Sequence, residues 1–540
     1  MSGAGHADHF SSRGRTTSSG GDSGGTETSG MASARTRSQV IGLSLLAIDR
    51  AAQESLRQQL YVRVRDAIVR GEMRAGFRLP STRIVAKELA LSRNTVGDVF
   101  AQLVAEGYLV ARHGSGTYVA ANAIALTGRV ASPLPRSSWE RASMRGRLFA
   151  AIPEHDRLSA KRPLPFQPGI PDVERFPFET WSRIASRLMR RPRAELVSYG
   201  DPAGYRPLRE VIAAELRSRK GIACRDDQIV VVGGTQQALD LICRLTLDVG
   251  DAVWIEEPSS RNVRAAFTGA GCTMVPVPVD ADGIDVARGR KLAPGARLAF
   301  VTSAHQWPLG PTLSAPRRAE LLDWAEEADA FVVEDEYDGV FRYDGERPTP
   351  LRALDDDRVI WIGSFSMTTF PGLRVGYLVA PPQLVDAFVA AKGAADRQTS
   401  SFEQAILAEF IYDGHYYRHR SRMQAIYAER GAHLVTLLRE LTGIEIAPPR
   451  AGLHVVLPLP PAVDDRALSL RSADAGVIAP ALSPHYLTPA SRSGLLLGFG
   501  IADLRAIERT APLLARGVAS VTARPKGLRP MPRAARELPG

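Results

Sequence analysis

Polar residues that suit phosphate binding stand directly after one apolar, strand-like run of the sequence. Gly234, Thr235 and Gln236 follow the run 229–232 and open a helical segment. Free backbone N–H groups and a hydroxyl at a helix N-terminus favour a phosphate, and the guanidinium fork of Arg374 matches a phosphate dianion. These residue types predict a site for a phosphorylated ligand, although a plain strand-to-helix turn explains the first three residues as well.

A second set of polar residues follows two further apolar runs. Asp335 and Tyr337 come after the run 331–333. Because they lie two residues apart in an extended segment, their side chains point to the same side. His305 follows the run 298–302. A ligand-binding role competes here with two simpler interpretations, which are a solvated acidic cluster at a strand end and a structural histidine.

The elements that would position these residues form an α/β pattern from 165 to about 520. Helical segments alternate with apolar β-type runs at 229–232, 252–255, 298–302, 331–333 and 359–362. This alternation predicts a mainly parallel sheet with helices on both faces. Ligands of such sheets bind at the carboxyl ends of the strands, which is where the candidate residues are found.

An N-terminal stretch has the pattern of a helix-turn-helix followed by a β-hairpin. Helical periodicity begins near Leu56 and ends at Gly71, and Ser81 and Ser92 are suitable N-caps for two further short helices. Two β-type runs, 108–110 and 117–119, flank a basic, glycine-rich tip. This order of elements predicts a winged helix.

The chemistry of this stretch suits DNA. Side chains at the start of a recognition helix reach base edges, and Arg93 can contact guanine through two hydrogen bonds. Asn94 and Thr95 can reach bases or phosphate. The basic residues between 74 and 93 are opposed by Glu88 alone: Arg74, Arg78, Arg83, Lys87 and Arg93. The alternative is a small helical domain with a solvated basic face.

Length and composition set the domain organisation. The 540 residues carry a net charge of +10, which favours anionic partners. The sequence has no apolar run of the ~20 residues that a membrane span needs, so we expect no membrane partner. Three widely spaced cysteines indicate buried thiols in a reducing cytoplasm. We expect a disordered segment 1–50, a winged helix 51–120, an irregular linker 121–164, an α/β domain 165–520 and a basic disordered tail 521–540.

Three motifs resemble the winged helix of GntR-type regulators. They are Leu-Pro-Ser-x-Arg at 79–83, Ser-Arg-Asn-Thr-Val at 92–96 and Gly-Ser-Gly-Thr at 114–117. The resemblance implies a double-stranded DNA operator as partner. The residues implied to contact it are Ser81, Arg83, Arg93, Asn94, Thr95, His113 and Gly114.

The segment 361–377 and the acidic run before it resemble the pyridoxal-phosphate site of fold-type I aminotransferases. Arg374 lies seven residues after Met367, which is the family spacing between the Schiff-base lysine and a phosphate-binding arginine. The resemblance implies that the Asp335 carboxylate holds the pyridine nitrogen protonated and that Tyr337 binds the ring oxygen. The full set implied to bind the cofactor is Gly234, Thr235, Gln236, His305, Asp335, Tyr337, Ser364, Ser366, Met367 and Arg374.

Three positions depart from the aminotransferase pattern. Met367 stands where the family has lysine, and a thioether cannot form the Schiff base. Ser260 replaces the aromatic residue that stacks on the cofactor, and 494–497 lacks an arginine that some relatives use for a substrate carboxylate. Either Met367 fills a collapsed pocket as an adaptable apolar residue, or the pocket still takes pyridoxal phosphate or another phosphorylated or aromatic ligand without a covalent bond.

A GntR-type winged helix before an aminotransferase-like domain resembles the MocR/GabR-type regulators. The resemblance implies a cytoplasmic, nucleoid-associated transcription regulator that forms a homodimer and senses a small-molecule effector, and Met367 predicts that it is not an enzyme. Two alternatives stay open, namely an active aminotransferase and a domain that serves only as a dimerisation scaffold.

Overall fold

The computed structural model describes residues 48–50, 52, 54–121, 142–151 and 164–522. It divides into two compact units, Met1–Ser138 and Trp139–Gly540. The segments predicted to be disordered, 1–50 and 521–540, lie almost wholly outside the described residues. Among the described residues, no helix is long and apolar enough to cross a membrane.

The first unit is the winged helix that the sequence predicts. Its helices are α2 (Leu56–Val69), α3 (Thr82–Glu88) and α4 (Arg93–Ala105), and β1 (Leu109–Arg112) pairs antiparallel with β2 (Gly116–Val119). The Ser81 and Ser92 hydroxyls accept hydrogen bonds from the first turns of α3 and α4, which fixes where these helices begin. The core consists of buried apolar side chains of all three helices, among them Leu60, Val64, Val85, Val99 and Phe100.

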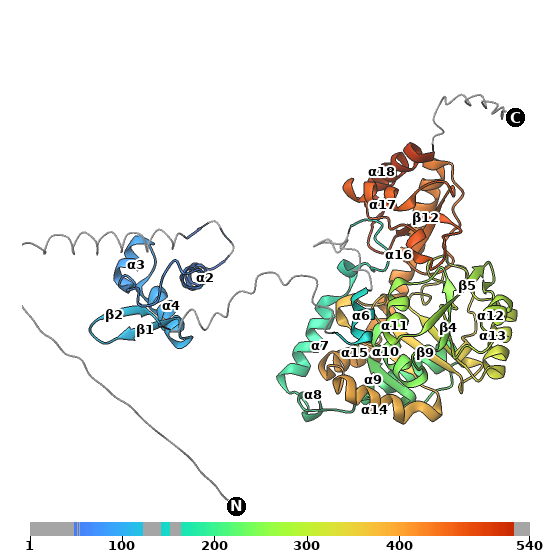
Figure 1. Cartoon of the computed structure of the whole chain (residues 1–540), viewed down its shortest axis with the longest axis horizontal. Helices are drawn as coiled ribbons and strands as arrows, with labels where there is room; N and C mark the ends of the chain where they lie inside the picture. Colours follow the sequence, from blue (N-terminus) through green and yellow to red (C-terminus); the bar gives the residue numbers. More distant parts are fainter. Residues whose placement is uncertain (1–47, 51, 53, 122–141, 152–163, 523–540) are drawn as a thin grey trace, which may run out of the picture. The chain divides into compact units, whose positions relative to one another are not determined.

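The second unit is built around an eight-stranded sheet (Figure 1) with the strand order β3-β10-β9-β8-β7-β4-β5-β6. The pairs among β9, β8, β7, β4 and β5 are parallel, whereas β10 and β6 are antiparallel to their neighbours. The prediction of a mainly parallel sheet is therefore confirmed. The strands are β3 (Ile229–Val232), β4 (Ala252–Glu257), β5 (Thr273–Asp280), β6 (Gly283–Ile284), β7 (Leu298–Val301), β8 (Phe331–Glu336), β9 (Val359–Ser364) and β10 (Gly376–Val379).

Helices cover both faces of this sheet. One face packs against α10 (Thr235–Thr246), α11 (Arg261–Ala270) and α14 (Val385–Asp396). The other face packs against α7 (Phe178–Arg190), α9 (Arg206–Glu215) and α15 (Ser401–Tyr412) at one end. At its other end it packs against α12 (Val286–Leu292) and α13 (Ala315–Glu327). The short helix α8 (Ala194–Val197) contacts α15.

A smaller part with its own core follows the sheet. The long helix α16 (His415–Thr442) leads into a two-stranded sheet of β11 (His454–Leu459) and β12 (Ser493–Gly498), packed on α17 (Asp465–Asp474) and α18 (Leu504–Thr522). The Met367 side chain packs against this smaller core. Helix α18 extends two residues into the segment 521–540 that we expected to be a tail.

One helix corrects the expectation of an irregular linker. Helix α6 (Met144–Ala151) lies inside 121–164 and packs on α11. The contact depends on Gly269, because a Cβ atom there would lie 2.2 Å from a ring carbon of Phe149. The remainder of the expected linker, 122–141 and 152–163, lies outside the described residues.

Candidate functional site

The structure brings Arg374 to the start of α10, where the phosphate site was predicted. Gly234 is the N-cap of α10 with a φ of 116°. A Cβ atom at Gly234 would lie 3.1 Å from a guanidinium nitrogen of Arg374, so only glycine leaves this approach open. Arg374 itself has a left-handed φ of 53° and an exposed side chain. The result is a cradle of backbone N–H groups and a guanidinium, which suits a phosphate.

The other residues predicted for the phosphate occupy the edges of this cradle. Thr235 and Gln236 form the first turn of α10, and the Gln236 side chain is exposed. Ser364 ends β9, and Ser366 lies two residues further on. Their hydroxyl oxygens are 3.1 Å apart. Ser364 pairs with Gly376, and a Cβ atom at Gly376 would lie 3.1 Å from the Gly234 Cα, so the end of β9 is close to the start of α10.

A residue not singled out from the sequence, Gln237, braces the cradle. Its Oε1 accepts a hydrogen bond of 2.7 Å from the Gly233 N–H, and its Nε2 donates to Asp396 at 2.8 Å. Asp396 also pairs with the fully buried Lys392 at 2.5 Å. Lys392, the next lysine after Met367 in the sequence, is thus engaged in an ion pair with Asp396.

Asp335 lies at the end of β8 and is 6% exposed. Its Oδ1 is buried without a hydrogen-bond partner among the described residues. Burial, together with the nearby carboxylates of Asp338, Glu336 and Glu256, raises the pKa of Asp335 to about 8. An unpaired buried acceptor is costly. A ligand that donates a hydrogen bond to this oxygen, such as a protonated ring nitrogen, would remove that cost.

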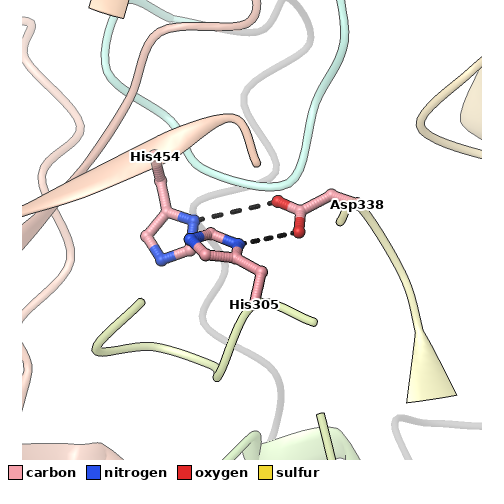
Figure 2. Close-up of side chains that lie close together, drawn as sticks. All are labelled: His305, Asp338 and His454. Atoms are coloured by element: carbon pink, nitrogen blue, oxygen red, sulfur yellow. Dashed lines mark hydrogen bonds and ion pairs between the residues drawn. The ribbon is translucent and has the colours of Figure 1, made fainter. Parts of the chain in front are cut away.

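Tyr337 contacts a buried group made of His305, Asp338 and His454, and Figure 2 shows these three side chains. Nδ1 of His305 lies 2.9 Å from Oδ1 of Asp338 and 3.0 Å from the Tyr337 hydroxyl. Nδ1 of His454 lies 4.0 Å from the other Asp338 oxygen, and its Nε2 faces the Pro308 carbonyl oxygen at 2.9 Å. The 2.9 Å distance between His305 and Asp338 is a hydrogen-bond length. The His305 ring therefore contacts both Asp338 and Tyr337, and we assign it to positioning the Tyr337 hydroxyl.

The electrostatics of the network keep one of its histidines neutral. Burial lowers the pKa of His454 to about 4, with a further contribution from His305. At neutral pH His454 is therefore uncharged, and the Asp338 carboxylate is held mainly by His305. Asp338 and His454 escaped the sequence analysis because they come from separate elements, the loop after β8 and the start of β11.

The position at which the sequence motif predicts a Schiff-base lysine holds an apolar side chain, Met367. Met367 packs against the smaller core, and the Ser260 position has no aromatic ring to cover the pocket. The polar residues still fit pyridoxal phosphate on two observations of this structure, the cradle at Gly234 and the unpartnered Asp335 oxygen. When bound, this cofactor supplies an aldehyde and an electron-accepting ring, but the described site lacks the lysine that would bond the aldehyde.

The residues predicted to contact DNA lie on the exposed surface of the winged helix. Arg93 and Asn94 are exposed at the start of α4, while Thr95 is half-buried with its hydroxyl 2.8 Å from that of Ser92. His113 and Gly114 are exposed at the hairpin tip. Arg83 is exposed on the first turn of α3, next to Ser81, which caps that helix. The described geometry leaves these side chains accessible to a duplex.

Comparisons with known proteins agree with both units. Residues 56–119 match the family "Bacterial regulatory proteins, gntR family", and residues 174–493 match "Aminotransferase class I and II". LysN, an α-aminoadipate aminotransferase from Thermus thermophilus, superposes with a TM-score of 0.65 at 27% identity, covering 71% of this chain and 99% of LysN. Fold and sequence together define a winged helix joined to a fold-type I aminotransferase domain.

Full-length relatives give the family. A probable rhizopine catabolism regulatory protein, MocR of Rhizobium meliloti, is 38% identical over 464 residues, which is 85% of this chain and 93% of the relative. The pyridoxine biosynthesis transcriptional regulator PdxR of Corynebacterium glutamicum is 28% identical and covers 85% of this chain and 95% of its own length. The chain belongs to the MocR-type transcriptional regulators, in which a gntR-family domain precedes an aminotransferase-like domain.

Proposed function

We propose that this regulator binds pyridoxal phosphate, or a closely similar phosphorylated pyridine, without a covalent bond, and that this ligand controls binding to an operator. The observation that carries the proposal is the buried Asp335 oxygen without a partner, beside the Gly234 and Arg374 cradle, in a site whose lysine position holds Met367. The chain keeps the groups that recognise the cofactor and lacks the amine that makes it a catalyst. On this proposal it is not an enzyme, and it works in the cytoplasm at the nucleoid.

Each recognition group has a defined task in this proposal. The Arg374 guanidinium and the α10 amides bind the phosphate, Asp335 accepts a hydrogen bond from the ring nitrogen, and Tyr337 contacts the ring oxygen. Ligand binding affects the DNA-binding unit only if the ligand favours one arrangement of the two units over another.

Calorimetry with the full chain tests the ligand. We expect saturable binding of pyridoxal phosphate that dialysis reverses. Because Asp335→Asn and Arg374→Ala each remove a charge-assisted hydrogen bond, each should weaken binding by about tenfold or more. Arg358→Ala, which removes only a surface ion pair with Asp329, is the matched control. The absence of heat and of any thermal shift would favour the dimerisation scaffold instead.

DNA binding has a separate test. Arg93→Ala should weaken specific operator binding by ~1–3 kcal/mol and relax the preference at one base pair. Arg70→Ala, at the exposed C-cap of α2, is the control and should leave the footprint unchanged. An unaltered footprint and affinity for Arg93→Ala would contradict the assignment of α4 as the recognition helix.

We also propose that the chain forms a homodimer through the aminotransferase-like domain. Four large apolar side chains are exposed near this part of the domain. They are Met189 on α7 (65% exposed), Val197 on α8 (68%), Tyr199 just after α8 (78%) and Tyr412 on α15 (83%). Helix α15 packs against both α7 and α8, so the helices that carry these residues are neighbours. Exposed apolar surface of this kind commonly marks a protein interface.

A further inference from the structure

A polar cavity of about 430 Å³ lies on the face of the sheet opposite the proposed cofactor site. Glu334 and Glu336 line it, and they alternate along β8 with Asp335, so their side chains point to the other face. Its remaining walls come from the segment after α9, from α13, from α16 and from the loop after β8. A volume of this size is ordinary for a small-metabolite site.

The walls of the cavity carry more cations than anions. The lining side chains include six basic residues and four glutamates. The innermost pairs are Lys220 with Glu336 and Arg420 with Glu215, the latter at 2.6 Å. The side chains of Glu336 and Arg420 are only 7% and 12% exposed. Burial raises the pKa of Glu334, and the Arg318 guanidinium lies 3.9 Å from its carboxyl group.

The cavity has an inner extension that reaches the back of the cofactor site. The extension is lined by Tyr337 and Ser364, together with Lys220, Trp361 and Arg420, which also line the main cavity. The Trp361 indole N–H is buried and, within the part of the chain that the structure describes, has no acceptor in good hydrogen-bond geometry, although the Tyr377 hydroxyl lies nearby. A donor without an acceptor, on a wall with excess positive charge, favours a ligand that brings acceptor oxygens.

We propose that this cavity is a second ligand site, which binds a small metabolite carrying carboxylate or phosphate groups. Lys220 and Arg420 donate charge-assisted hydrogen bonds to the ligand. The glutamates in the lining select ligands whose anionic groups can reach these cations without approaching a carboxylate. The main cavity uses the opposite face of the sheet and none of the cradle residues Gly234, Thr235 and Arg374. Only its inner extension shares Tyr337 and Ser364 with the proposed cofactor site.

Titration of the full chain with succinate and with inorganic phosphate, at constant ionic strength, tests the site. We expect saturable binding of at least one probe, and the difference between the two tells carboxylate from phosphate recognition. Because removing one partner leaves a buried charge unpaired, both partners are changed together. Lys220→Met with Glu336→Gln, and Arg420→Met with Glu215→Gln, should each weaken binding by about tenfold or more.

The controls separate this cavity from general charge effects and from the first site. Arg206→Met with Glu210→Gln removes an exposed ion pair of α9 and should leave the affinity unchanged, as should Asp335→Asn. Ser421→Trp narrows the cavity from an exposed position on α16 without breaking an ion pair and should also block binding. The proposal would be overturned if neither probe bound, or if the exposed-pair control lost as much affinity as the cavity variants. It would also be overturned if Asp335→Asn lost affinity while Ser421→Trp kept it.

Discussion

At the scale of single residues, the proposed function combines a catalytic lysine replaced by Met367 with polar groups that would still recognise the cofactor. Met367 is an apolar residue packed into the smaller core, whereas Asp335 remains buried with an unsatisfied oxygen. If the pocket had only collapsed, a polar group of this kind would be a persistent cost. A ligand that donates a hydrogen bond removes that cost.

Restoring the amine tests whether the remaining site is intact. Met367→Lys combined with Ser260→Tyr should produce a covalent adduct with pyridoxal phosphate, because the cradle and Asp335 already orient the cofactor. Borohydride reduction followed by mass spectrometry should place the adduct on residue 367, while the parent chain should lose the cofactor on dialysis. An adduct on another lysine in both proteins would contradict this explanation.

The raised pKa of Asp335 also predicts how stability depends on pH. A carboxyl group with a higher pKa in the folded state binds its proton more tightly when folded. Its contribution to the free energy of unfolding is therefore fully present below the unfolded value of 3.8 and is lost as the pH rises through about 8. In urea titrations across this window, Asp335→Asn should lose less stability than the parent chain. An equal loss would place the pH dependence elsewhere, for example at Glu256, whose pKa burial raises to about 7.

The sequence identified the residues whose role depends on a local pattern and missed those whose role depends on distant partners. The strand-to-helix turn at Gly234 and the Asp335–Tyr337 spacing were visible as patterns. Gln237 and His454 were not, because their partners, Asp396 and Asp338, lie far away in the chain. The acidic run along β8 was visible, but the cavity that Glu334 and Glu336 line became apparent only from the packing of α13 and α16.

At the scale of elements, capping and strand composition were the reliable signals. The Ser81 and Ser92 caps begin α3 and α4 as expected, and β3 spans 229–232 as predicted. Helix α6 was missed because its sequence shows no clear apolar face and its docking depends on a partner. Phe149 fits against α11 only because Gly269 has no side chain.

The docking of α6 can be tested by a matched pair of glycine substitutions. Gly269→Ala should displace Phe149, because its Cβ atom would come within 2.2 Å of the ring. Hydrogen exchange across 142–151 should then become faster. Gly295→Ala, where no atom lies within 4 Å of the added Cβ, should have no effect. Unchanged exchange in Gly269→Ala would show that α6 is held by other contacts.

At the scale of the whole molecule, the two units have separate cores, and the proposed homodimer would present two winged helices to one operator. Val197→Asp with Tyr412→Asp places charges in the exposed apolar region and should shift sedimentation towards the monomer. Operator affinity should fall by about 10²-fold or more, because the second winged helix no longer binds as a linked partner. The single winged helix should keep its own weak affinity, and a fully retained dimer would exclude this region as the interface.

The anchoring of α6 on α11 also sets a limit on operator architecture. With 142–151 held on the larger unit, only the roughly 20 residues 122–141 separate it from the winged helix, in place of the whole expected linker. A chain of that length spans at most about 70 Å when fully extended. In the proposed homodimer, the tether of each winged helix is therefore less than half as long as the sequence suggests, so operator half-sites spaced beyond its reach cannot be bound by both winged helices at once.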